Sequence, residues 1–232
     1  LADIVHVAGA DGGTGASPLS SIKNAGAPWE LGLVETQRTL VAEGLRGRVR
    51  LRVDGGLKTG RDVLVAALLG ADEYAFGTAL LLAEGCLMVR SCHLDTCPVG
   101  IATQRPELRA KFAATPAMVA AYLHLVAEDV RQGLASVGLR SLEDAVGRAD
   151  LLLRRTTGDP RADLLVLDSL HELPGDGPLR YAEETPAVAE GGELDVRLAV
   201  DAARALREPR LIDRSYRIRN RDRAVGANLS GR

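Results

Sequence analysis

Short apolar runs alternate with longer amphipathic stretches through the first 85 residues of the chain. The apolar runs Asp3–Val7, Val49–Val53 and Glu73–Phe76 have the length of buried strands. Between them, Glu30–Leu45 carries an apolar stripe with helical spacing, and Arg61–Leu69 begins with a capping-box pattern. The connections are short enough to require parallel strands, so the pattern predicts an α/β fold in β–α–β–α–β order.

Glycines follow each of these expected strands, where a backbone can approach a ligand closely because no Cβ is in the way. The carboxyl ends of the strands carry the active site in a (β/α)8 barrel, and its phosphate site lies in the loops after the last two strands. A doubly wound sheet is the alternative, although its glycine fingerprint usually follows the first strand. The candidate cofactor-binding residues are therefore Gly12, Gly13, Asp54, Gly55, Gly56, Gly77 and Thr78.

The pattern becomes helical in the second half of the chain. Thr115-Pro116 is an N-cap followed by proline at the first helical position, and Gly138 ends the helix that begins there. Ser141 and Asp144 begin a shorter helix, which we expect to run on toward Leu153.

Residues 156–209 read as a surface-running connector, interrupted by a short helix at Leu198–Leu206. The arginine-rich run Arg214–Arg223 predicts a solvated strand rather than a nucleic-acid-binding patch.

All three cysteines lie within one short stretch, as Cys86-x5-Cys92-x4-Cys97, with Pro98 after the last. Burial as small hydrophobes is one explanation, and a disulfide fits less well because an odd number leaves one thiol over. Zinc normally takes four ligands with shorter spacing, although His93 could be the fourth. Iron–sulfur clusters are held by thiolates, and the ferredoxin motif also closes on Cys-Pro, so three thiolates favour a cluster with three irons.

Composition narrows the classes of function. The chain is 46% hydrophobic but only 3% aromatic, so its core must be built from Leu, Val and Ala. A net charge of −2 gives no reason to expect nucleic acid or a membrane surface as a partner. No window approaches the roughly 20 apolar residues of a membrane span, and no signal peptide is present, so we expect a cytoplasmic protein.

Five stretches of the chain resemble the large subunit of glutamate synthase. They are DGGTGASPLSSIKNAG (Asp11–Gly26), PWELGL (Pro28–Leu33), RLRVDGGLKTGRDV (Arg50–Val63), GC-x5-C-x4-CPVG (Gly85–Gly100) and NRDRAVGANLSG (Asn220–Gly231). The cysteine spacing together with DGGTGASP is specific, whereas DGG or GT alone would be weak.

The resemblance implies a division of the chain into five parts. Residues 1–85 would be the last part of an FMN-binding (β/α)8 barrel, and residues 86–100 would hold a [3Fe–4S] cluster through Cys86, Cys92 and Cys97. A helical segment (101–155) and a connector (156–213) would lead to a β-helix domain that begins in residues 214–232. The chain opens within a strand pattern and stops without a final element, so we expect an internal piece of a longer protein, inactive alone.

The implied reaction is the reductive amination of 2-oxoglutarate to L-glutamate. Ammonia would come from glutamine, the hydride from reduced FMN, and electrons from an NADPH-oxidising small subunit or from ferredoxin. The family's catalytic side chains lie mostly outside this chain, and Ala10 stands where histidine or another polar residue is common in the family.

Two other classes of protein compete with this reading. Another barrel that binds FMN or a nucleotide phosphate, such as inosine-monophosphate dehydrogenase or a hydroxyacid oxidase, would share the glycine loops but would not need three clustered cysteines. A non-catalytic electron-transfer domain or a zinc-stabilised scaffold would keep the cysteines but would not need the glycine loops. The visible spectrum separates these alternatives, because flavin and iron–sulfur absorption differ.

Overall fold

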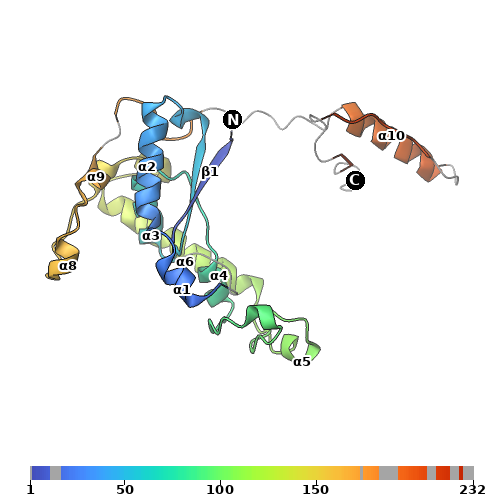
Figure 1. Ribbon diagram of the computed structural model, residues 1–232, viewed down its shortest axis with the longest axis horizontal. Coiled ribbons are helices and arrows are strands. Elements are labelled where there is room, and N and C mark those ends of the chain that lie inside the picture. Colours follow the sequence, from blue (N-terminus) through green and yellow to red (C-terminus); the bar gives the residue numbers. More distant parts are fainter. Residues whose placement is uncertain are drawn as a thin grey trace. The chain divides into compact units, whose positions relative to one another are not determined.

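Three parallel strands form a sheet in the order β1–β2–β3 within the computed structural model, which describes residues 2–10, 17–172, 175–182, 193–207, 213–219 and 225–226 (Figure 1). The strands are β1 (Ile4–Ala8), β2 (Arg50–Asp54) and β3 (Glu73–Tyr74). Ile4 pairs with Arg50 and Arg52 pairs with Glu73. Parallel strands joined by helices confirm the α/β class and are compatible with part of a (β/α)8 barrel.

The chain divides into two units, Leu1–Glu183 and Glu184–Arg232. The helices of the first unit are α1 (Leu19–Asn24), α2 (Trp29–Ala42), α3 (Gly60–Leu68), α4 (Thr78–Ala83), α5 (Pro106–Arg109), α6 (Pro116–Ser136), α7 (Leu142–Ala145), α8 (Pro160–Asp163) and α9 (Asp168–His171), with short 3-10 turns η1 (Arg46–Arg48), η2 (Cys92–Leu94) and η3 (Ala149–Leu151). The second unit contains α10 (Glu193–Arg207). The predicted boundaries at residues 85, 100, 155 and 213 stay predictions.

The start of α3 is capped as its sequence predicts. Thr59 Oγ1 accepts a hydrogen bond from the Asp62 N–H, and the Asp62 carboxylate accepts one from the Thr59 N–H. This reciprocal pair satisfies two N–H groups that have no partner inside the helix. None of the helices in the described ranges is long and apolar enough to cross a membrane.

Two predictions on the later chain were wrong. The helix that begins after Ser141 stops at Ala145 and does not run on toward Leu153. Gly147 takes a φ of +79°, and its N–H donates to Ala67 O at 2.9 Å, so a long-range hydrogen bond replaces the next helical turn. The expected strand Arg214–Arg223 is also absent over the described residues 213–219.

Residues 213–219, which have no regular structure, contact α10 through side chains. The Tyr216 hydroxyl donates to the Asp201 carboxylate, and the Arg197 guanidinium lies 5.6 Å from the centre of the Tyr216 ring. Helix α10 also begins at Glu193, earlier than the predicted Leu198. Both differences lie within the second unit.

The hydrophobic core lies between the sheet and helices α2 and α3. Leu33 of α2 and Leu51 and Val53 of β2 have no exposed surface, and Val63 of α3 joins the same cluster. Helix α6 then packs on α3: a Cβ added to Gly60 would lie 2.4 Å from the backbone nitrogen of Val130. The sheet is therefore covered by helices on one face.

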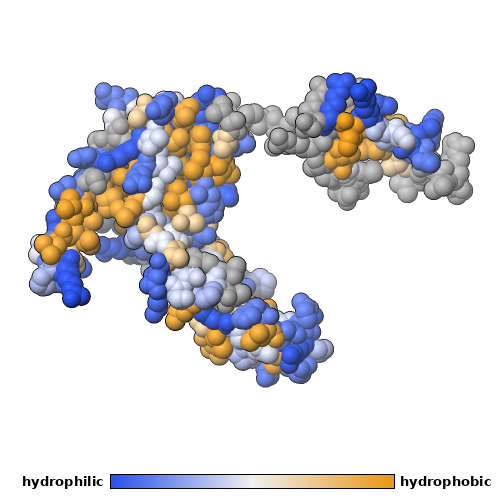
Figure 2. Space-filling view, viewed as in Figure 1, coloured by the Kyte–Doolittle hydropathy of each residue, from blue (hydrophilic) through white to orange (hydrophobic). Residues whose placement is uncertain are grey.

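The opposite face of the sheet is open and mixed in character. Ile4 is 39% exposed, and alternate residues of β1 are exposed with it. Arg52 Nε donates to the Glu73 carboxylate at 2.8 Å, and His6 Nε2 lies 3.9 Å from Asp54 Oδ2. Figure 2 shows hydrophobic surface over the region of β1 and again over the α8–α9 segment, where Leu164, Leu165 and Val166 are exposed.

A buried arginine closes the amino edge of the sheet. Arg46 has no exposed surface, and its guanidinium donates to Gln37 Oε1, to Val49 O and Gly70 O at 2.9 Å each, and to Asp72 Oδ2 at 2.7 Å. Burial lowers the pKa of Arg46, and the neighbouring Asp72 carboxylate opposes that shift. The charge is tolerated because its donors have acceptors on several sides.

The same network holds residues 175–182, which belong to the predicted connector, against the sheet. Gln37 Nε2 donates to Leu179 O at 2.8 Å, and the Tyr181 N–H donates to Asp72 Oδ1 at 3.1 Å. We call this segment the 175–182 strap. Part of the predicted surface connector is therefore attached to the core.

Candidate functional site

The loops after β1 and β2 come together at the carboxyl edge of the sheet. Ala8 pairs with Asp54 in the β1–β2 register, and the Gly9 N–H donates to Asp54 O at 3.0 Å. Gly55 and Gly56 have φ values of +127° and +90°, which L side chains rarely adopt. The structure thus brings the predicted Asp54-Gly55-Gly56 loop next to the loop after β1. Gly12 and Gly13 lie outside the described residues.

Gly55 is needed by the chain's own packing. A Cβ at this position would lie 2.7 Å from Gly9 N and 2.9 Å from Gly9 Cα. Its N–H also donates to Asp54 Oδ1 at 2.6 Å, so this donor already has a partner.

Gly77 is different, because no heavy atom lies within 4 Å of a Cβ added there. Its φ of −116° does not demand glycine either. Thr78 is the first residue of α4. The chain itself therefore gives no reason for glycine at this position, and the space beside it is open to a ligand.

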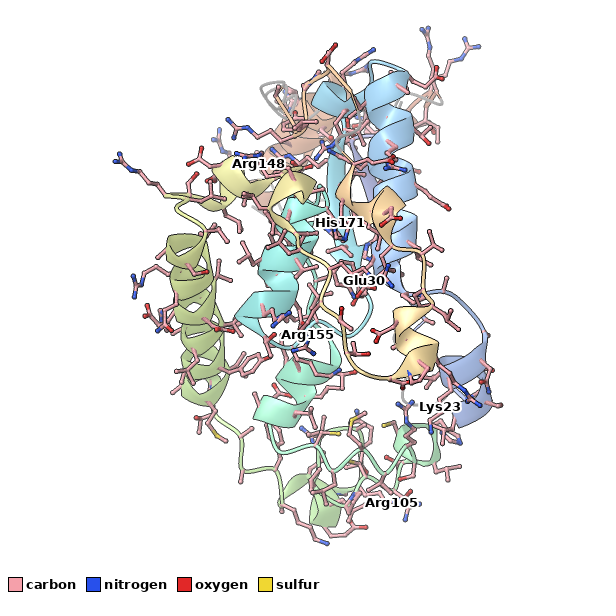
Figure 3. The ribbon with its side chains drawn as sticks, turned by 90° about the vertical axis from the view of Figure 1, so that its left-hand side faces the viewer. Lys23, Glu30, Arg105, Arg148, Arg155 and His171 are labelled. Atoms are coloured by element: carbon pink, nitrogen blue, oxygen red, sulfur yellow. The ribbon has the colours of Figure 1, made fainter. Side chains whose placement is uncertain are left out.

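A cavity of about 500 Å³ opens beside Gly55 and Gly56. Its other lining residues are Ala10, Ile22, Lys23, Gly26, Pro28, Trp29, Glu30 and Asp62. Figure 3 shows Lys23 on α1 and Glu30 at the start of α2. The sequence reading missed Lys23, although a lysine shortly after a glycine-rich loop is a signal for an anion site. Gly77 and Thr78 do not line this cavity.

The three cysteines line one small cavity of about 20 Å³, together with neighbours from residues 87–91 and 98–99. All three are free thiols; Cys97 is 7% exposed, Cys86 is partly buried and Cys92 is exposed. The predicted gathering of the cysteines around one cavity is therefore found. Among the described residues, however, no group of three or more His, Cys, Asp or Glu side chains is close enough together to hold a metal ion.

The backbone around this cavity is unusual. Met88, Arg90 and Asp95 have φ values of +54°, +58° and +58°, and no other non-glycine residue in the described ranges has a positive φ. The Met88 N–H donates to Cys86 Sγ at 3.4 Å. Left-handed residues of this kind cost free energy, and they cluster at ligand-binding sites in proteins.

The chain after Cys97 surrounds its sulfur with backbone donors. Hydrogen bonds from the N–H of Ala102 above all, and from those of Val99, Ile101 and Gly100, lower the pKa of the Cys97 thiol, although burial opposes the shift. These bonds favour the thiolate, which is the form that binds metals. This effect is found at Cys97, within a cysteine segment that forms no metal-holding group among the described residues.

Comparison with known proteins decides the family. A family model described as "Conserved region in glutamate synthase" matches residues 1–140. Over 99% of its length, the chain is 47% identical to ferredoxin-dependent glutamate synthase 2 of Synechocystis sp.. The chain belongs to the glutamate synthase family.

Other glutamate synthases extend this likeness. The chain is 47% identical to ferredoxin-dependent glutamate synthase 1, chloroplastic/mitochondrial, of Arabidopsis thaliana, and 46% identical to the NADPH glutamate synthase large chain of Azospirillum brasilense, each over 99% of its length. The chain spans only 14–15% of these relatives. The likeness continues through residues 141–232, beyond the family model.

Proposed function

We propose that this chain is part of the synthase domain of a glutamate synthase, which converts 2-oxoglutarate to L-glutamate with ammonia derived from glutamine. The observation that carries the proposal is the single cavity lined by Cys86, Cys92 and Cys97, directly after the glycine-bearing carboxyl edge of a parallel sheet. An FMN- or nucleotide-binding barrel without an iron–sulfur centre would not need three cysteines around one cavity. A non-catalytic scaffold domain would not need glycines at the carboxyl edge of the sheet.

In this proposal the glycine edge of the sheet would hold the FMN phosphate and the cysteine segment would hold a [3Fe–4S] cluster. Gly56 and Lys23 border the cavity at the sheet edge, and Gly77 leaves open space beyond β3. Backbone N–H groups and a lysine are what a phosphate dianion requires. When bound, FMN would supply a hydride to the imine formed from 2-oxoglutarate and ammonia, and the cluster would deliver the electrons.

The cysteine segment would contribute its three sulfurs as ligands, together with apolar neighbours. Leu87 and Val89, 65% and 57% exposed, border the cavity. Solvent exposure and hydrogen bonds to the sulfurs are among the features that set the reduction potential of a cluster. The electron donor is ferredoxin or an NADPH-oxidising small subunit; relatives of both kinds are about equally similar to the chain. A cytoplasmic location stays a prediction, and some relatives are named as chloroplastic.

The visible spectrum and iron content of the full-length protein test the proposal. Cys92→Ser should lose iron and the broad absorption of the cluster while the protein stays folded, because Cys92 is exposed and its side chain supports no core packing. Ser91→Ala is the matched control at the preceding residue and should keep full iron content. A wild-type protein with flavin but no iron, or a Cys92→Ser variant with unchanged iron, would refute the cluster assignment.

A further inference from the structure

A cavity of about 250 Å³ lies at the amino edge of the sheet. This volume is below the roughly 300–1,000 Å³ of pockets that hold drug-sized ligands, so the cavity suits a smaller molecule. The sheet edge, helix α7 with the residue after it, and the 175–182 strap each form part of its lining. The lining residues are Arg50, Asp72, Glu73 and Tyr74 of the sheet edge, Leu142, Glu143 and Val146 of the α7 side, and Arg180 and Tyr181 of the strap.

The two carboxylates of the sheet edge already have partners within the chain. Asp72 Oδ2 lies 2.7 Å from Arg46 Nη2, and Glu73 Oε2 lies 2.5 Å from Arg52 Nη2. Opposite charges at these distances offset each other, and the side chains are held in place. The charges that a ligand would meet therefore come mainly from the other two sides of the cavity.

The α7 side of the cavity is negative. Glu143 is exposed, lines the cavity and has no ion pair with another residue in the described ranges. Its charge reaches the sheet edge: burial above all, then Asp72 and Glu143, raise the pKa of Tyr74. The Tyr74 hydroxyl donates to Ala71 O at 2.8 Å, which fixes the ring beside Glu143.

The strap side of the cavity is positive. Arg180 is exposed, lines the cavity and likewise has no ion pair with a residue that the structure describes. The next residue, Tyr181, is held from two directions. Its N–H donates to Asp72 Oδ1 at 3.1 Å, and the Arg50 guanidinium lies 4.7 Å from the centre of its ring. The strap therefore carries Arg180 at a fixed place beside the cavity.

Glu143 and Arg180 line the same cavity without forming an ion pair with each other. A simple anion beside Arg180 would be repelled by Glu143, and a simple cation beside Glu143 would be repelled by Arg180. A small molecule with one cationic and one anionic group complements both side chains. The α-ammonium and α-carboxylate of an amino acid form such a pair, and Leu142 and Val146 offer apolar surface to its side chain.

We propose that this cavity binds a free α-amino acid with a small apolar side chain, its carboxylate directed at Arg180 and its ammonium at Glu143. The site lies at the amino edge of the sheet, whereas the glycine loops lie at the carboxyl edge. The inference therefore goes beyond the proposed function and requires neither flavin nor a cluster. A bound amino acid would also join α7 to the strap.

Equilibrium dialysis of the full-length protein against radiolabelled L-alanine, L-valine and L-leucine tests the proposal. Glutamine and glutamate are left out, because the proposed reaction already uses them. At least one of the three probes should bind saturably. Acetate and methylammonium carry one charge each and should compete at least about tenfold more weakly, since each loses one charge-assisted hydrogen bond.

Two variants locate the binding. Glu143→Gln and Arg180→Gln each remove one charge with little loss of side-chain length, and each should weaken binding by at least about tenfold. Both side chains are exposed, so the fold should stay intact, and circular dichroism checks this. Asp144→Asn is the matched control, because it removes an exposed carboxylate of α7 that does not line the cavity. It should bind as the wild type does.

Three results would overturn the inference. The first is a folded wild-type protein that binds none of the three amino acids saturably. The second is binding that Glu143→Gln and Arg180→Gln leave unchanged, because the amino acid would then lie elsewhere. The third is acetate binding as tightly as the amino acids, because the ammonium group would then be irrelevant. The flavin and iron content of the same preparation bears on the proposed function alone, so the two can fail separately.

Discussion

Gly55 and Gly77 follow neighbouring strands but have opposite surroundings. Gly55 combines a positive φ with backbone contact to Gly9, so any side chain there disturbs the meeting of two loops. Gly77 has an ordinary φ and empty space around its missing Cβ. A substitution at Gly77 therefore tests ligand space, whereas one at Gly55 tests folding.

We expect Gly77→Ala to weaken FMN binding by at least about tenfold, because the added methyl group takes space that the flavin phosphate would use. Such a loss corresponds to about 1.4 kcal/mol. The measurement is flavin titration of the full-length apoprotein by fluorescence, with the thermal midpoints of the flavin-free forms compared. Gly55→Ala should instead lower the thermal midpoint of the flavin-free form. Wild-type flavin affinity in Gly77→Ala would remove this residue from the site.

Local sequence identified the residues whose role depends on composition and spacing, and it missed those whose role depends on distant contacts. Asp54, Gly55 and the three cysteines lie in the predicted places because strand ends and short-range spacing define them. Thr103 carries no such local signal, because its buried hydroxyl depends on a contact with Asp95. Lys23 follows the glycine-rich loop and could have been identified from that position, but the cavity that it lines is formed by separate loops. Whether Gly56, Gly77 and Thr78 bind phosphate stays a prediction.

At the scale of elements, hydrophobic periodicity was sufficient to predict a helix or strand where that element packs against another. Strands β1 and β2 and helices α2 and α6 were predicted within a few residues, because a buried stripe is visible in the sequence. Periodicity failed for α7, which gives way to a hydrogen bond with Ala67 O at Gly147, and it overlooked the short helices α1, α4 and α5. Helices of four to six residues have too few turns to show a period.

The crossing of α3 and α6 is set by small residues. A Cβ on Gly60 would lie 2.4 Å from Val130 N and 2.7 Å from the carbonyl carbon of Asp129, both backbone atoms. On Gly32 of α2 it would lie 3.2 Å from the end of the Val7 side chain, which can move. We expect Gly60→Ala to destabilise the protein by about 1–3 kcal/mol.

Gly32→Ala is the matched control for this prediction. Gly32 lies inside α2, where alanine gains up to about 1 kcal/mol of helix propensity over glycine, whereas Gly60 is the first residue of α3. A loss of stability in Gly60→Ala beside unchanged or higher stability in Gly32→Ala therefore reports the close approach of α3 and α6. Urea unfolding of the full-length protein, monitored by circular dichroism, measures it. Equal stability of the two variants would contradict a tight α3–α6 crossing.

For the whole molecule, the open face of the sheet bears most directly on whether the sheet is part of a closed barrel. Helices cover the other face, and β1 pairs with β2 alone among the described residues. A closed barrel would enclose the open face, and with it Ile4 and the Arg52–Glu73 pair. A barrel cannot be derived from three strands, because closure depends on further strands beyond the three that the described residues form.

Ile4→Ala tests whether that face is enclosed in the full-length protein. We expect a loss of about 2–5 kcal/mol, the cost of truncating a buried isoleucine. A surface isoleucine would cost no more than about 0.5 kcal/mol. Val5→Ala, at a partly buried position that packs against the core, is the reference on the same strand. A negligible effect of Ile4→Ala beside a large effect of Val5→Ala would show that the sheet stays open.

The 175–182 strap also determines when the amino edge of the sheet can complete its hydrogen bonds during synthesis of the chain. Asp72 and the Tyr181 N–H that it accepts are 109 residues apart, and Gln37 and Leu179 are 142 apart. A ribosome adds about 5–20 residues per second, so roughly 5–20 s separate the synthesis of Asp72 from that of Tyr181. During that interval Arg46 can already bind Asp72 Oδ2. Asp72 Oδ1 and Gln37 Nε2 do not yet have their final partners and form hydrogen bonds with water instead. A nascent chain can therefore form its sheet early, but the amino edge of that sheet acquires its final hydrogen bonds only after nearly all of the first unit has left the ribosome.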